Sequence, residues 1–145
     1  MTDKFMDLAI AQAAKSLGEG GVPVGSVLVA NGQVIGAGHN RRVQDGDPIA
    51  HGEMDCIRAA GRQKSYRDMT LYTTLSPCMM CSGTIVQFGI GRVVIGENET
   101  FGGNEGFLRE RGVQVEVIDS AECVSLMREF IQRFPAIWKE DIGED

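Results

Sequence analysis

The sequence has 145 residues, of which 20 are acidic and 14 basic, giving a formal net charge of −6. This length suits one domain with a buried core. Because nucleic-acid binders gain most of their affinity from cations that neutralise phosphates, the acidic balance excludes a nucleic-acid partner from our expectations and favours a small, uncharged one. No apolar run is long enough to cross a membrane and no secretory signal is visible, so we expect a cytoplasmic location.

The first half of the chain predicts two helices with a β-hairpin between them. Apolar residues recur at helical spacing near the start, and Gly18 follows as a stop signal. The dipeptide Asn31-Gly32 between two apolar runs is typical of a tight hairpin turn. The expected helix, two strands, loop and second helix span residues 3–17, 24–30, 33–38, 39–47 and 48–60.

The second half alternates strands with helices. Pro77 suits the first turn of a helix, and Pro135 stops the last one. The two later strands each follow a helical segment, as in parallel β-α-β crossovers. The expected strand, helix, two strands and helix span residues 70–75, 77–88, 93–96, 113–118 and 121–134, and an acidic tail follows at 136–145.

This order of elements predicts the fold class. A hairpin followed by alternating strands and helices places five strands in one mixed sheet. Helices should cover both faces of the sheet, which makes a three-layer α/β/α sandwich. No repeat, linker or low-complexity stretch interrupts the pattern. We therefore expect a single domain over residues 1–145, with residues 135–145 as a C-terminal lid segment.

Two short motifs carry the residues of a zinc site. His51-Gly52-Glu53 opens the second predicted helix, and Pro77-Cys78-Met79-Met80-Cys81 opens the third. One imidazole and two thiolates are good ligands for Zn²⁺, which prefers four ligands in a tetrahedron. Three protein ligands leave the fourth position for water, as in catalytic zinc sites. We predict one Zn²⁺ per chain, bound by His51, Cys78 and Cys81.

The remaining cysteines and histidine predict no second site. Cys56 and Cys123 lie in apolar helical patterns and are expected to be small buried hydrophobes. The alternative for the C-x-x-C pair is a structural zinc or a redox pair. A structural zinc would need a fourth ligand, and His39 is the other histidine of the chain. We expect His39 to be a loop residue with a local hydrogen bond instead.

Glu53 is the candidate catalytic residue. Zinc lowers the pKa of a bound water towards ~7, so a neighbouring carboxylate must then move protons. Glu53 lies two residues from His51, close enough to be beside the metal without coordinating it. The pattern H-x-E…P-C-x-x-C is typical of zinc deaminases, in which this glutamate is the general acid and base.

Several stretches of the sequence extend this pattern to a family. They are residues 21–25, 38–40, 51–53 and 71–78, followed by 96–98, Phe101 and the ending 138–144. They resemble the cytidine deaminase-like superfamily, and are most similar to the fungal-type cytosine deaminases. The resemblance covers nearly the whole chain, and the ending is its most discriminating part, because many relatives share the zinc motif and far fewer share this tail.

The resemblance implies hydrolysis of free cytosine to uracil and ammonia by a homodimer, with a small nucleobase as the substrate. Glu53 would protonate the ring nitrogen and then help ammonia to leave. Asn40 would hydrogen-bond the pyrimidine edge, and Asp141 would accept from the exocyclic amine. The backbone of Gly52 and the carbonyl of Ser76 would fix the ring and its amine. Asn40 as a plain turn former and Asp141 as a solvated residue are the alternatives.

Two aromatic residues would form the walls of the substrate pocket. The resemblance gives this role to Phe101 and Trp138, while Trp138 could equally be a packing anchor for the tail. Trp138 and Ile142 are four apart and would share one face of a short helix, as a lid requires. The chain departs from the fungal pattern at Lys139, and also at residues 54–56 and 45–48.

The sequence leaves three other functions open. Isocytosine, guanine or another aminated heterocycle could replace cytosine, because pocket shape decides between them. A tRNA adenosine deaminase shares the zinc motif, but the acidic balance and ending would repel phosphates. A non-catalytic, zinc-stabilised binding module is the third alternative, and a structural site has no need of Glu53.

Overall fold

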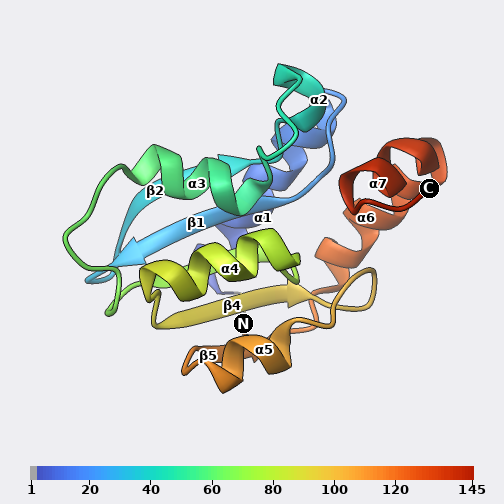
Figure 1. Cartoon of the computed structure of the whole chain (residues 1–145). Coiled ribbons are helices and arrows are strands. Elements are labelled where there is room, and N and C mark those ends of the chain that lie inside the picture. Colours follow the sequence, from blue (N-terminus) through green and yellow to red (C-terminus); the bar gives the residue numbers. More distant parts are fainter. Residues whose placement is uncertain (1–2) are drawn as a thin grey trace.

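The computed structural model describes residues 3–145 and has a five-stranded sheet between two layers of helices (Figure 1). The sheet order is β2-β1-β3-β4-β5. β1 pairs antiparallel with β2 and β3, whereas β3, β4 and β5 run parallel. The predicted five-stranded mixed sheet is thereby confirmed. The strands are β1 Gly25–Ala30, β2 Gln33–His39, β3 Thr70–Leu75, β4 Arg92–Glu97 and β5 Gln114–Val117.

Seven helices connect or cover these strands in the described part of the chain. Side-chain caps begin several of them, since Asp3 accepts hydrogen bonds at the start of α1 and Ser120 does so at the start of α6. The helices are α1 Lys4–Gly18, α2 Arg42–Asp45, α3 Gly52–Ala60, α4 Met79–Phe88, α5 Glu105–Glu110, α6 Ala121–Arg133 and α7 Pro135–Asp141.

Alternating side chains of the strands form one core on each face of the sheet, so the predicted three layers are also present. On the face that is in front in Figure 1, Leu28 and Leu71 pack with Ile57 of α3 and Ile85 of α4. On the other face, residues such as Val27 pack against α1 and α6. A third cluster joins α6 and α7 at the end of the sheet, and contains Val22, Val24, Leu75, Met127, Phe130 and Trp138.

The segment before α3 differs from the prediction. The expected helix at 48–60 begins only at Gly52, because Asp47 forms a local turn in which its side chain accepts from the amide of Ile49 at 3.0 Å. The expected loop at 39–47 contains the short helix α2, and His39 is the last residue of β2. His51 consequently lies at the cap of α3 with extended backbone, rather than inside the helix.

Other boundaries move by a few residues. Cys78 caps α4, so Pro77 lies just outside the helix that it was expected to open. Pro135 ends α6 as predicted but also opens α7. Met1 and Thr2, which belong to the predicted domain and to the argument against a signal, lie outside the described residues. Within residues 3–145, no helix has the length and apolar character needed to span a membrane.

Candidate active site

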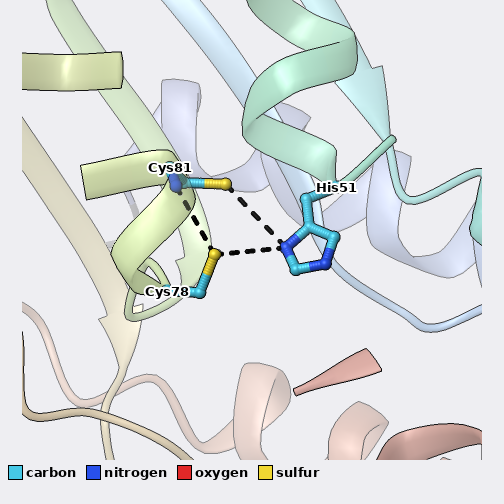
Figure 2. A group of neighbouring side chains, drawn as sticks. All are labelled: His51, Cys78 and Cys81. Atoms are coloured by element: carbon cyan, nitrogen blue, oxygen red, sulfur yellow. Dashed lines mark hydrogen bonds between the residues drawn. The ribbon is translucent and has the colours of Figure 1, made fainter. Parts of the chain in front are cut away.

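Three side chains converge where α3 and α4 begin. His51 caps α3, Cys78 caps α4, and Cys81 lies in the first turn of α4. Figure 2 shows the imidazole pointing at both thiols, with Nδ1 3.4 Å from Cys78 Sγ and 3.8 Å from Cys81 Sγ. Ligand atoms 2.0–2.3 Å from a tetrahedral zinc would lie roughly 3.3–3.8 Å apart. The three residues therefore fit a Zn²⁺ ion, with room for one further ligand.

At Cys78, the start of α4 also favours the thiolate form that metal binding requires. The backbone amide of Cys81 donates to Cys78 Sγ at 3.4 Å. Hydrogen bonds from the Cys81 side chain and from His51 lower the pKa of Cys78 to about 4, against the opposing effect of burial. A thiolate is the form in which cysteine binds metals. Within the described residues, the group of metal-binding side chains contains these three and no fourth, which matches an open site rather than a closed structural one.

Glu53 lies on the first turn of α3 and lines the same cavity as His51 and Cys78. It is 3% exposed, and burial together with the charge of Cys78 raises the pKa of its carboxyl to about 7. A carboxyl group with a pKa close to the working pH can both give and take protons. Its position beside the zinc ligands is therefore suited to general acid and base chemistry.

A small cavity lies beside these groups. All six residues that the sequence predicted as substrate contacts line it, together with Glu53 and the zinc ligands His51 and Cys78. Sequence reasoning gave Val24 and Leu75 no role in the pocket, although both lie inside the stretches 21–25 and 71–78 that carry the family resemblance. The lining consists of Val24, Asn40, His51, Gly52, Glu53, Leu75, Ser76, Cys78, Phe101, Trp138, Asp141 and Ile142.

Polar contacts connect α7 to the zinc-binding end of the molecule. Asn40 Nδ2 donates to Asp141 Oδ1 at 2.9 Å, and Asp141 Oδ2 lies 3.5 Å from His51 Nε2. Arg42 reaches the same helix, with Nη1 3.6 Å from Glu140 and Nε 4.0 Å from Asp141. Burial raises the pKa of Asp141 despite these partners. Asp141 is therefore a buried carboxyl, not a solvated one, and Arg42 is a contact that the sequence did not indicate.

The two predicted aromatic walls meet edge to face. The ring centroids of Phe101 and Trp138 are 6.2 Å apart, and the planes are nearly perpendicular. Trp138 is 8% exposed and packs with the third cluster while it lines the cavity. Its two expected roles, packing anchor and pocket wall, are thus compatible.

The other predicted sites lie elsewhere. His39 is fully buried at the end of β2, and its Nδ1 lies 2.9 Å from the carbonyl oxygen of Asn40, which is a local hydrogen bond as expected. Cys56 and Cys123 are buried and free, in agreement with their assignment as small hydrophobes. None of these three belongs to the group of metal-binding side chains.

Comparisons with known proteins agree with this geometry. The family model of the cytidine and deoxycytidylate deaminase zinc-binding region matches residues 1–97. The chain belongs to this family. The deaminase is 49% identical to cytosine deaminase from Candida albicans, over 97% of this chain and 96% of the relative. It is 36% identical to a tRNA-specific adenosine deaminase from Streptococcus pyogenes, over 89% of each protein.

Solved structures also resemble the deaminase. One from work on tRNA:A34 deaminases, which edit A to I at the wobble position, has a TM-score of 0.76 and 30% identity. It covers 85% of this chain and 98% of that one. Family membership and the site of His51, Cys78 and Cys81 together identify the protein as a zinc-dependent hydrolytic deaminase.

The zinc assignment predicts the effect of removing one ligand. Cys78→Ala should weaken zinc binding by more than ~100-fold, because even groups that only orient metal ligands contribute ~10–100-fold. Elemental analysis of the dialysed proteins measures this directly. Cys123→Ala is the control, since it also removes a free thiol, but one that lies in another cluster. Undiminished zinc in Cys78→Ala would contradict the assignment.

Proposed function

We propose that this deaminase hydrolyses free cytosine to uracil and ammonia. The observation that carries the proposal is the cavity beside the zinc ligands, which α7 closes with Trp138 and Asp141. The free space in this cavity is small, which favours a single base ring over a larger substrate. The 49% identity to a cytosine deaminase, which extends through α7, supports the same substrate.

The polar groups of the cavity match the edges of cytosine. A small uncharged base gains affinity only from near-complete enclosure and a few placed hydrogen bonds. We assign the pyrimidine edge to Asn40, and the exocyclic amine to Asp141 and the carbonyl of Ser76. The backbone of Gly52 would contact the ring. A side chain is not tolerated there, because a Cβ at Gly52 would lie 2.8 Å from the carbonyl oxygen of Val24.

The reaction needs two proton transfers that one carboxyl group can serve. Hydrolysis forms a C–O bond at the carbon that carries the amine and then breaks its C–N bond. His51, Cys78 and Cys81 would hold the zinc, which would supply Lewis-acid activation of water near neutral pH. Glu53 takes a proton from the attacking water and gives it to the ring nitrogen. It then moves the second proton to the amine, which leaves as ammonia. The buried position of Glu53 and its pKa of about 7 suit both transfers.

The alternatives have weaker support. A tRNA substrate would require phosphates to approach a chain of net charge −6 beside the acidic residues Glu140 and Asp141. A binding module would not need a carboxyl group such as Glu53, whose burial is costly. Isocytosine and guanine differ from cytosine only in shape and in the pattern of donors and acceptors, so they belong in the test.

A panel of free bases assayed for ammonia release tests this function. Cytosine should be hydrolysed faster than isocytosine, guanine or adenine.

Glu53→Gln should keep one zinc per chain and lower kcat by at least ~10²-fold, since general acid–base groups contribute ~10²–10⁴-fold. A variant that retains a tenth of the wild-type kcat would exclude Glu53 as the proton carrier.

We further propose that residues 135–145 act as a lid that selects the substrate. Asp141→Ala should lower kcat/KM for cytosine about 10-fold or more, as expected for loss of a charge-assisted hydrogen bond of ~1.5–3 kcal/mol. Deletion of the residues after Phe134 should leave a zinc-loaded protein with almost no activity. Glu144→Ala is the control, because Glu144 is exposed beyond α7. Steady-state kinetics with cytosine measure these effects. An unchanged kcat/KM for Asp141→Ala would contradict the proposal that residues 135–145 select the substrate.

We also propose that the active form is a homodimer in the cytoplasm. The contact expected from the sequence was the apolar face of residues 81–88, but Cys81 and Ile85 on it are buried, so we place the contact at the exposed ends of α4. In support, Phe88 at the end of α4 is 48% exposed, and Met79 at its start is 57% exposed. Sedimentation velocity at micromolar concentration should give twice the mass of one chain, and Phe88→Glu should shift it towards the monomer. A wild-type protein that sediments only as a monomer would refute the dimer.

A further inference from the structure

The loop between β4 and α5 brings Phe101 to the cavity without regular secondary structure. Residues 98–104 contain no strand and no helix. A loop of this kind is usually mobile unless side chains hold its backbone. Here two carboxylates do so. At its start, the buried Glu97 accepts from the amide of Thr100 at 2.8 Å and from the hydroxyl of the same residue. At the end of the loop, the second carboxylate is that of Glu105.

Glu105 joins three separate parts of this region. Its Oε2 accepts from Ser76 Oγ at 2.5 Å and from the amide of Gly103 at 3.2 Å. Its Oε1 accepts from Asn98 Nδ2 at 3.0 Å. One carboxylate thus holds both ends of the loop, and connects them to the segment that leads from β3 into the zinc-binding helix α4.

A neighbouring contact strengthens the same junction. Asn104, which precedes Glu105, donates through Nδ2 to the carbonyl oxygen of Pro77 at 3.0 Å. Ser76 and Pro77 are the two residues before the zinc ligand Cys78. The loop of Phe101 is therefore attached to the segment that contains Ser76, which lines the cavity, and the zinc ligand Cys78.

The chemistry of Glu105 fits its partners closely. All three are donors, and an ionised carboxylate is the side chain that only accepts. Partial burial would raise the pKa of Glu105, but the hydrogen bonds from Ser76 and Asn98 outweigh it and lower the pKa below its usual value. An amide of the same shape would turn an NH₂ group towards one of these donors, and so could not replace all three contacts.

We propose that Glu105 is a positioning residue of this active site. Its carboxylate fixes Ser76 and the loop of Phe101 relative to each other, so that the wall and the amine-binding carbonyl face the base together. The proposal rests on the proposed function for its substrate. It extends to α7, because Phe101 contacts Trp138 edge to face. Loosening the loop should therefore also loosen the packing of Trp138.

Glu105→Gln tests the proposal against a matched control on the same loop. Glu99 is exposed, and its side chain makes no hydrogen bond among residues 3–145, so Glu99→Gln should resemble the wild type. For Glu105→Gln, KM for cytosine should rise about 10–100-fold, as for loss of charge-assisted hydrogen bonds. The kcat should change far less, and zinc content should stay at one per chain, because the ligands and Glu53 are not touched.

A second readout does not depend on activity. Trp138 is the single tryptophan of the chain, so its fluorescence reports on the Phe101 contact directly. Glu105→Gln should shift the emission to longer wavelength and increase quenching by acrylamide. Glu105→Asp, which keeps the charge, should recover part of both effects. If Glu105→Gln does not fold, the same measurements are made on Glu105→Asp, for which smaller changes in KM and in Trp138 emission are expected.

The outcomes separate this proposal from the proposed function. Wild-type KM and wild-type Trp138 emission in Glu105→Gln would overturn the positioning role. A loss of kcat as large as the expected rise in KM, with KM itself unchanged, would also overturn it. Such a result would indicate an effect on the chemical step rather than on the position of the substrate. If the wild type deaminates another base in the panel, cytosine fails as the substrate, while the fluorescence comparison still decides the role of Glu105. Non-additive KM effects of Ser76→Ala and Glu105→Gln would locate the coupling between them.

Discussion

The meeting of two helix starts at one end of the sheet is the constraint on which the site depends. His51 is presented by α3, and both thiols by α4, so the ligand set exists only while these helices keep their relative positions. Close packing holds them. Gly38 in β2 lies so near α3 that a Cβ there would be 2.5 Å from the amide nitrogen of Cys56. Ile85 of α4 is fully buried against the same face of the sheet.

The backbone carbonyl and the side chain of Asn40 have hydrogen-bond partners near this junction, which keeps them in place. The carbonyl of Asn40 accepts from Ser16 Oγ at 3.0 Å and lies 2.9 Å from His39 Nδ1. The side chain of Asn40 accepts from the amide of Arg42 and donates to Asp141. A buried amide held by one donated and one accepted hydrogen bond has a fixed orientation, and fixed groups lose little entropy when a small ligand binds. The polar side of the cavity is therefore organised before a base arrives.

The sequence predicted what depends on local pattern, and missed what depends on contacts between distant residues. Hydrophobic periodicity and turn dipeptides were enough for the sheet and its helices, and the spacing of residue types that bind zinc was enough for the two zinc-binding motifs. The helix expected from Pro48 failed because the Asp47 side chain competes for a backbone amide nearby. No local sequence pattern marked Glu105, because its hydrogen bond to Ser76 joins residues that are 29 positions apart in the chain. Asp141 and Asn40 lie 101 positions apart in the chain, so the family resemblance, and not a local pattern, assigned both residues to one site.

The family model ends at Glu97, immediately before the loop of Phe101. Metal ligands and proton carrier lie within the matched part, whereas Phe101, Trp138 and Asp141 lie in the last third of the chain. The cavity is thus assembled from two consecutive stretches, because Asn40, Gly52 and Ser76 of the matched part face it together with these three residues. Changes confined to the second stretch would reshape one side of the cavity and leave the group of His51, Cys78 and Cys81 in place.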